Sequence, residues 1–274
     1  MSLPGPASAP FGRRQLEVTG IYQLGVYRVL RVADPDCPPP AAGQFAMLAA
    51  AERWGGGDAE RPFLPRAFSI ARIRDGEAHY LLEDVGPGTH RLCELEAGDP
   101  IHVTGPLGRG FTGPQEGRRA ILAGGGVGIA PLAILQDQLE DEGIETTVLL
   151  GFRDASRLPG ADLLRGAQIA TDDGSSGHHG LITDLLEAEL KRDPGAVVYS
   201  CGPAGMLEGV RALCEDAGVP SQLALEAGMA CGFGACYGCV VPKRGGGYLR
   251  VCVDGPVIDG HDLDHVEAHA GAPS

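Results

Sequence analysis

The spacing of four cysteines limits what this chain can fold into more than any other feature of its sequence. Four of the eight cysteines fall within 22 residues near the C-terminal end, with glycines between them: Cys231, Cys236, Cys239 and Cys252. The order Cys-x4-Cys-x2-Cys with a later fourth cysteine is typical of the thiolate ligands of a [2Fe-2S] cluster. Glycines permit positive φ angles and leave backbone N–H groups free to point at sulfur. The pattern therefore predicts a small iron-sulfur lobe that a cluster holds together.

Two other interpretations of these cysteines stay open at this point. Structural zinc also takes four cysteines, although zinc sites usually have two Cys-x2–4-Cys pairs and this chain has one. Free thiols are the second alternative, because a chain without an export signal keeps its cysteines reduced. We also expect Cys252 to lie on a strand, with Val251 and Val253 pointing away from the cluster.

The charge of the chain argues against a nucleic-acid partner. There are 22 basic and 36 acidic residues, a net charge of −14, which repels a phosphate backbone. The longest uncharged run, 120–136, is too short and too rich in glycine to cross a membrane. The charged, alternating sequence after Arg13-Arg14 does not resemble an export signal. We therefore expect a cytoplasmic protein.

Two patterns of expected secondary structure divide the rest of the chain. Before residue 116, the segments 15–32 and 43–50 show partial period-2 alternation and are expected to be strands. Segments 66–73 and 78–83 are expected to form a hairpin around a turn at Asp75-Gly76, and 101–104 is a further expected strand. From 116 to 223 strands alternate with helices, the latter expected at 129–142 and 203–217, which predicts a parallel sheet with crossover helices. We expect three domains, at 1–115, 116–223 and 224–274. The segment 52–65 has no periodicity and is expected to be a mobile surface loop.

Two turns in the second domain have the form of a nucleotide site. One follows a strand and opens a helix, where glycines let the backbone approach a pyrophosphate; it consists of Gly124, Gly125, Gly126, Val127 and Gly128. The other, Cys201-Gly202-Pro203, ends a later strand of the same sheet. Either turn alone could be a tight connection without a ligand. Two at one sheet edge favour a bound nucleotide.

The first domain carries two weaker signals. Arg66 and Phe68 share one face of a strand while Ser69 takes the other. Gly88-Thr89 begins a short helical segment that offers N–H groups and a hydroxyl to a diphosphate. Each of these could equally be an ordinary strand or turn.

Taken together, these motifs identify a resemblance over nearly the whole chain. The cysteines, both turns, Arg66-Ala67-Phe68-Ser69, Gly88-Thr89, the segment 105–111 (GPLGRGF) and the segment 251–257 (VCVDGPV) are similar to those of electron-transfer subunits of type B dihydroorotate dehydrogenase, within the ferredoxin-reductase superfamily. The resemblance implies an antiparallel flavin-binding β-barrel, a parallel-sheet nicotinamide-binding domain and a C-terminal [2Fe-2S] lobe.

The same resemblance implies which residues bind the cofactors. Arg66 would neutralise the FAD diphosphate, and Ser69 would hydrogen-bond near the flavin N5. The rest of the FAD site would be lined by Ala67, Phe68, Leu81, Leu82, Glu83, Gly88 and Thr89. The two turns of the second domain would hold NAD. Three positions depart from the family: Ala67 replaces a common proline, Glu83 a common basic residue, and Arg109 a frequent asparagine.

The function that follows is electron transfer between NAD and a partner, with no acid or base needed on this chain. The resemblance implies a flavin-containing (FMN) dihydroorotate dehydrogenase catalytic subunit as that partner, a role in pyrimidine biosynthesis, and a heterotetramer. We expect the partner to dock near Cys231 to Cys239, at exposed Phe233 or Tyr237. Arg153 and Asp154 leave NAD and NADP both open, and family resemblance favours NAD. A subunit serving ferredoxin, hydrogenase or sulfite reductase is the main alternative, and a zinc-stabilised nucleotide-binding scaffold without redox activity is another. Residues 52–65 and the tail after Asp259 carry no functional motif.

Overall fold

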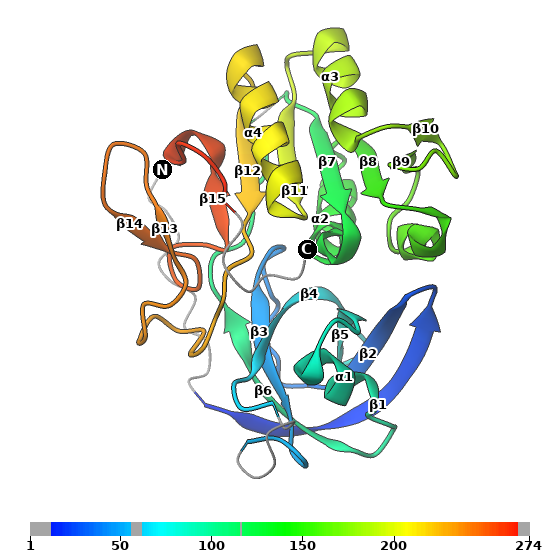
Figure 1. The fold of residues 1–274 in the computed structure, drawn as a ribbon, viewed down its shortest axis with the longest axis vertical. Coiled ribbons are helices and arrows are strands. Elements are labelled where there is room, and N and C mark those ends of the chain that lie inside the picture. Colours follow the sequence, from blue (N-terminus) through cyan, green and yellow to red (C-terminus); the bar gives the residue numbers. More distant parts are fainter. Residues whose placement is uncertain (1–11, 56–61, 116, 268–274) are drawn as a thin grey trace.

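The computed structural model describes residues 12–55, 62–115 and 117–267. A β-barrel forms the lower half of the molecule, a sheet flanked by helices forms the upper half, and the cysteine-rich segment lies along one side of both (Figure 1). The expected surface loop at 52–65 is described only in part, because 56–61 lie outside the described residues, as do 268–274 of the tail. Within the described residues, no helix is long and apolar enough to cross a bilayer.

The barrel is closed and antiparallel, as expected, with strand order β1-β2-β5-β4-β3-β6. Side chains alternate between its packed interior and its outer face, so the interior holds residues such as Val18, Leu30, Leu48 and Leu82. A short helix, α1 (Pro87–Cys93), contributes Leu92 to the same core. The strands are β1 (Arg14–Leu24), β2 (Tyr27–Ala33), β3 (Phe45–Ala50), β4 (Arg66–Arg74), β5 (Glu77–Glu83) and β6 (Pro100–Leu107).

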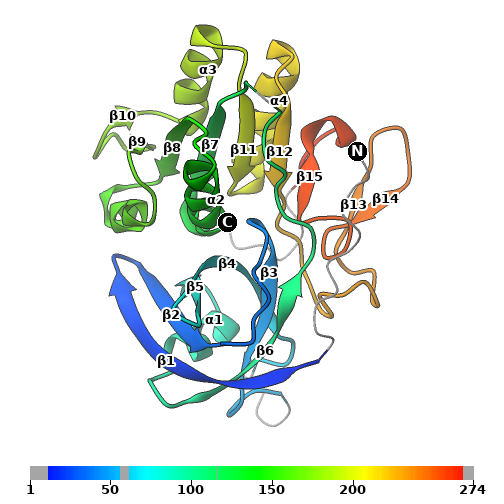
Figure 2. The ribbon, with the colours of Figure 1, turned by 180° about the vertical axis from the view of Figure 1, so that it is seen from behind.

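The upper half is a seven-stranded sheet of order β10-β9-β8-β7-β11-β12-β15, in which only β15 runs antiparallel to its neighbour. Alternate residues of β7 point to opposite faces: Leu122 packs with α2, and Ile121 packs with α3 and α4. The helices therefore cover both faces (Figure 2). The elements are β7 (Ala120–Gly125), the 3-10 turn η1 (Gly126–Ile129), α2 (Ala130–Asp141), β8 (Thr146–Phe152), the 3-10 segment η2 (Ala155–Leu163), β9 (Gln168–Thr171), β10 (His178–His179), α3 (Ile182–Arg192), β11 (Val197–Cys201), α4 (Ala204–Ala217) and β12 (Ser221–Ala224).

The C-terminal segment has little regular structure of its own. It contains a small hairpin, β13 (Val240–Pro242) and β14 (Tyr248–Arg250), followed by β15 (Val257–Asp259) and the 3-10 turn η3 (Gly260–Asp262). β15 pairs with β12 and so extends the sheet of the second domain. Just before it, Gly255 O accepts the Arg109 N–H at 2.5 Å, which ties the segment to the end of the barrel.

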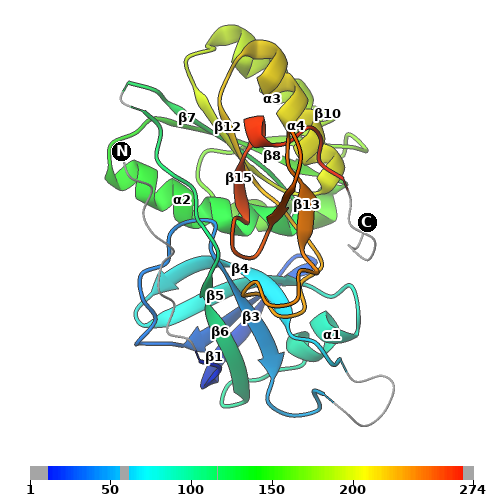
Figure 3. The same cartoon turned by 90° about the vertical axis from the view of Figure 1, so that its left-hand side faces the viewer.

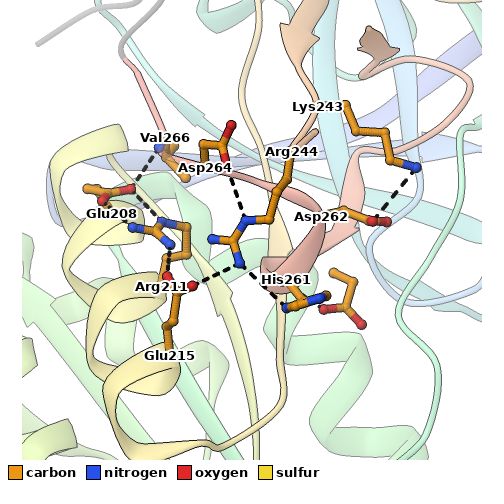
Figure 4. Close-up of polar contacts among 10 residues, drawn as sticks. Glu208, Arg211, Glu215, Lys243, Arg244, His261, Asp262, Asp264 and Val266 are labelled. Carbon is orange, nitrogen blue, oxygen red and sulfur yellow. Dashed lines mark hydrogen bonds and ion pairs between the residues drawn. The ribbon is translucent and has the colours of Figure 1, made fainter. Parts of the chain in front are cut away.

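An ion-pair network joins this C-terminal segment to α4 (Figure 4). Arg244, in the turn between β13 and β14, lies 2.8 Å from Glu215 Oε1 and 3.2 Å from Asp264 Oδ1. Arg211 of α4 pairs with both Glu208 and Glu215. The segment is thus held to the barrel by backbone hydrogen bonds and to the sheet domain by strand pairing and charge.

Candidate functional site

The four cysteines of the predicted cluster are gathered by the loop before β13 and the turn after β14. Cys239 and Cys252 are buried, with their sulfurs 3.1 Å apart, and Cys236 is exposed. Backbone donors surround the sulfurs: Gly238 N–H donates to Cys236 Sγ at 3.4 Å, and Cys252 N–H donates to Cys239 Sγ at 3.4 Å. The exposed member gives the group one edge that reaches solvent.

The surroundings of Cys231 favour a negatively charged sulfur. Burial raises the pKa of this thiol, but N–H donors from Phe233, Cys236 and Ala235 outweigh it and lower the pKa to about 6. At the other end of the group, burial and the adjacent Cys239 raise the pKa of Cys252 to about 12. A thiolate cradled by backbone N–H groups is the donor chemistry that an iron-sulfur cluster requires.

The expectation that Cys252 lies on a strand is wrong. It lies in a turn directly after β14, in which Val253 N–H and Asp254 N–H both donate to Arg250 O, at 3.0 and 2.7 Å. The Asp254 carboxylate accepts the Arg250 N–H at 2.9 Å and stabilises this turn. The turn brings Cys252 against Cys239. If β14 continued instead, Cys252 would lie beyond Cys239.

Among the described residues, no three His, Cys, Asp or Glu side chains are placed to hold one metal ion. Zinc and an iron-sulfur cluster would use the four thiolates differently. A structural zinc site would require four ligands around one centre. In a [2Fe-2S] cluster the four thiolates are shared between two irons, so each iron takes only a pair.

The cysteine loop lies directly against the barrel. Gly232 has φ 80°, and a Cβ added there would lie 2.5 Å from Met47 Cγ, so only glycine allows the approach. Met47 is on β3, directly opposite Ala67 on β4. The predicted cluster is therefore one strand away from the predicted flavin strand, a proximity that the side view makes visible (Figure 3).

On β4, Arg66, Phe68 and Ser69 are all partly exposed. The Arg66 guanidinium crosses to α1, where its Nε lies 2.5 Å from the position of a Cβ on Gly88. Burial lowers the pKa of Arg66, as it does for a cation without a counter-anion. The structure thus brings Arg66 and Gly88, two residues of the predicted diphosphate site, into contact.

The side chains of four other predicted FAD residues contact the protein itself. The Thr89 hydroxyl donates to Gly86 O and accepts from the Val85 and Gly86 N–H groups, all at 2.9 Å, so it caps its own turn. Leu81 and Leu82 are buried in two hydrophobic cores. Glu83 pairs with Arg157 of η2 at 3.0 Å, so the acidic departure from the family connects the two domains.

The two predicted nucleotide turns meet at the carboxyl ends of β7 and β11. A Cβ on Gly128 would lie 2.5 Å from Cys201 O and 2.6 Å from Gly202 Cα, so the backbones are in direct contact. Cys201 is buried and its pKa is raised by burial, which makes it an unreactive thiol. The site therefore presents backbone groups rather than reactive side chains.

A cavity that no sequence motif indicated lies beside Arg66. It is about 100 Å³ in volume and is lined by residues that include Met47, Trp54, Phe63 and His102. Trp54 and Phe63 lie in the connection between β3 and β4, where the sequence has neither periodicity nor motif. Only the folded chain brings Trp54 next to Arg66, so no local signal could have found it.

Comparison with known proteins agrees with this geometry. Residues 226–264 match the family model described as the iron-sulfur cluster binding domain of dihydroorotate dehydrogenase B. The probable electron transfer subunit of dihydroorotate dehydrogenase B (NAD(+)) from Methanopyrus kandleri is 36% identical over 268 residues, which cover 96% of this chain and 93% of that protein. This chain belongs to the family of dihydroorotate dehydrogenase B electron transfer subunits. The electron transfer subunit of dihydroorotate dehydrogenase B (NAD(+)) from Bacillus caldolyticus is 40% identical over 210 residues. These residues cover 72% of this chain and 79% of that protein.

Solved structures with a similar fold include two reductases. An NADH-dependent reduced ferredoxin-NADP oxidoreductase has a TM-score of 0.80 at 26% identity, covering 93% of this chain and 91% of that one. Phthalate dioxygenase reductase has a TM-score of 0.61 at 16% identity, covering 94% and 96%. The barrel, parallel sheet and C-terminal lobe predicted from the sequence are confirmed, and the family match favours iron-sulfur over zinc.

Proposed function

We propose that this chain is the electron-transfer subunit of a type B dihydroorotate dehydrogenase, with FAD and a [2Fe-2S] cluster as its cofactors and NAD as its nucleotide. It passes electrons between NAD and a separate catalytic subunit that oxidises dihydroorotate, a step of pyrimidine biosynthesis. Family membership and the four-cysteine lobe support this function. We also propose the cytoplasm as its location and a heterotetramer as its assembly.

The observation that carries the proposal is the contact between the cysteine loop and the barrel. Gly232 rests on Met47, and Met47 lies opposite Ala67 in the strand assigned to FAD. A carrier of single electrons must lie near the group with which it exchanges them. The short connection through β3 supplies that proximity.

The residues of this chain bind and orient the cofactors rather than react. We assign Arg66 to the FAD diphosphate as its counter-charge, and Ser69 to the flavin N5 as a hydrogen-bond donor. When bound, FAD exchanges two electrons as hydride with a nicotinamide and single electrons with an iron-sulfur cluster. The remaining FAD assignments are Ala67, Phe68, Leu81, Leu82, Glu83, Gly88 and Thr89, and those for NAD are Gly124 to Gly128 and Cys201 to Pro203. The buried position of Leu81 and Leu82 restricts these two to backbone contacts.

The domain division that we propose for these roles is 1–115 for FAD, 116–223 for NAD and 224–274 for the cluster. We assign the docking of the catalytic subunit to the surface around Cys236. Phe233 and Tyr237 flank this cysteine and are 49% and 62% exposed. Large apolar side chains left in water beside a redox site are typical of a protein interface.

Replacing Cys236 with Ser tests the proposed route. We expect NADH to reduce FAD at nearly the normal rate, and reduction of the catalytic subunit to be abolished, because the cluster loses a ligand. Stopped-flow absorbance of each flavin measures the two steps. Cys37→Ser, in the connection between β2 and β3, is the matched control and should leave both rates unchanged. Undiminished electron transfer in the Cys236→Ser variant would show that the route is wrong.

A second candidate is a subunit that serves ferredoxin, and the match to the reduced ferredoxin-NADP oxidoreductase is the observation that favours it. The protein that co-purifies with the chain distinguishes the two. Dihydroorotate-dependent reduction of NAD by the isolated complex is the result expected from our proposal. A larger kcat/KM with NADPH than with NADH would overturn the choice of NAD.

A further inference from the structure

The cavity beside Arg66 has the features of a built binding site. It lies on the outer face of the barrel, where β3 and β6 provide the floor, and Trp54, Phe63 and Pro65 from the β3–β4 connection provide the walls. The indole N–H of Trp54 and Nδ1 of His102 are buried there without a hydrogen-bond partner among the described residues. Such groups cost free energy unless a ligand or water satisfies them. The eight lining residues include Met47, Ala49, Trp54, Phe63, Pro65 and His102 as well as the basic Arg13.

Trp54 connects this cavity to the predicted diphosphate site. The Arg66 guanidinium lies over its ring, 5.9 Å from the centroid, and touches Gly88 on its other side. Among the described residues, no carboxylate pairs with the Arg66 guanidinium, and its side-chain hydrogen bond is to Leu64 O. The cation thus lies between an aromatic ring and the residue predicted to begin the diphosphate site.

The direction of β4 indicates what would lie on Trp54. Arg72, toward the end of β4, pairs with Asp137 of α2, so the strand runs toward the nucleotide domain. Ser69 is about 10 Å farther along it than Arg66, at 3.3 Å per residue. With the flavin ring at Ser69 and the diphosphate at Arg66, the adenosine half of FAD continues past Arg66, away from the nucleotide domain. The ring of Trp54 lies against the Arg66 guanidinium, beside the predicted diphosphate position.

We propose that Trp54 forms the wall on which the adenine ring of FAD stacks, with its unpaired indole N–H available to the adenosine. This assignment rests on the proposed function, since it presupposes FAD on Arg66. An aromatic platform beside a cation suits a purine attached to a diphosphate. A side chain of the catalytic subunit is the other occupant that the cavity could take, and the tests below separate it.

The first test uses the fact that Trp54 is the only tryptophan in the sequence. The full chain, with its cluster in place and FAD removed, is titrated with ADP, which has the adenosine and diphosphate but no flavin. We expect ADP to quench tryptophan emission over the same concentrations at which it displaces FAD from a second, FAD-loaded sample. Inorganic pyrophosphate should leave the emission unchanged. Displacement of FAD without a change in emission, or no displacement at all, would overturn the assignment.

The second test compares FAD with FMN, which lacks the adenosine half. In Trp54→Ala we expect the Kd for FAD to rise about tenfold or more, the effect of losing one base–aromatic stack, with the Kd for FMN within twofold of normal. Trp54→Phe should restore most of the FAD affinity. Tyr248→Ala removes an exposed aromatic side chain from the distant β14 and is the matched control.

The outcomes separate this inference from the proposed function. Wild-type protein that binds neither FAD nor iron would contradict the proposed function. Normal wild-type binding with an unchanged ratio of FAD to FMN affinity in Trp54→Ala would contradict the inference alone. Weaker binding of the catalytic subunit by that variant, with FAD affinity intact, would assign the cavity to the protein interface instead.

Discussion

At the scale of single residues, the proposed nucleotide site depends on the absence of side chains. Gly128 touches the backbone of Cys201 and Gly202, so the turn after β7 and the turn after β11 form one continuous surface. The contacting atoms are backbone, which cannot move aside as the end of a flexible side chain can. The distance between the turns is therefore set by this one glycine.

Gly128→Ala should separate the two turns. The added Cβ is too close to Cys201 O to be accommodated without a backbone shift, a change that typically costs about 1–3 kcal/mol. We expect the KM for NADH to rise about tenfold, while flavin and cluster absorbance stay normal. Gly205→Ala, on α4 with nothing within 4 Å, is the control and should not affect KM. An unchanged KM in Gly128→Ala would show that the turns do not hold the nucleotide.

Residue identity could be predicted better than residue environment. The cysteine spacing singles out four residues as predicted ligands, because metal ligands recur at fixed intervals. The spacing does not predict the turn at Cys252, because the hydrogen bonds that turn the chain at Arg250 depend on Asp254 and have no periodic signature. Trp54 could not have been singled out, because its nearness to Arg66 depends on the path of the β3–β4 connection.

At the scale of elements, α3 is attached to the sheet by charge as well as by apolar packing. Ile182, Leu186 and Leu190 pack on the sheet. At the end of the helix, Glu189 accepts a hydrogen bond from Arg119 at 3.2 Å, and both side chains are about nine-tenths buried. Burial raises the pKa of Glu189, but Arg192 and Arg119 outweigh it and hold the pKa below its ordinary value.

Glu189→Gln should lower the free energy of unfolding by about 1–2 kcal/mol at pH 7, because it removes a charged partner from a buried guanidinium. Since the folded pKa is depressed, this contribution is complete above the unfolded pKa of about 4.3 and disappears as the pH falls through the folded value. Urea unfolding followed by circular dichroism at pH 7 and pH 3.5 measures both. The exposed Glu187 of the same helix pairs with Lys191, and Glu187→Gln should cost less. An equal loss at both pH values would contradict the electrostatic origin.

Four elements that the sequence does not predict lie in 155–196: η2, β9, β10 and α3. α3 had a usable signal, with apolar residues at Ile182, Leu186 and Leu190 and an acid, Asp184, that accepts the Leu181 N–H. The 3-10 segment η2 contains Pro159 and Gly160, which resemble a loop. β9 and β10 are too short for alternation to show, and their strand conformation comes from pairing with β8 rather than from their own residues.

At the scale of the whole molecule, the barrel and the sheet share one hydrophobic core. Tyr27, Ala71 and Leu81 of the barrel are buried in the same cluster as Ile129 and the buried residues of α2. Burial raises the pKa of Tyr27, and the Glu83 carboxylate nearby adds to the effect. The Glu83–Arg157 pair closes the edge of this interface, so flavin and nicotinamide domains are held in one orientation.

Glu83→Gln should weaken this interface. Because the two side chains are 23% and 22% exposed, solvent screens the pair, and we expect a coupling of about 1 kcal/mol in a double-mutant cycle with Arg157→Gln. Urea unfolding of the four proteins gives the value. The more exposed Glu140–Arg165 pair, which lies within the nucleotide domain, serves as the comparison and should couple less. Additive losses at Glu83 and Arg157 would mean that the pair contributes nothing to the interface.

The place of β15 in the sheet has a consequence for biosynthesis. Cys252 and β15 come late in the chain, yet β15 forms an edge of the sheet and Cys252 completes the sulfur group beside the barrel. A nascent chain can close its barrel and lay down β7 to β12 while it is still attached to the ribosome. All four thiolates are available to iron only after Cys252 has emerged, so the predicted cluster site is completed after the barrel and β7 to β12 have been synthesised.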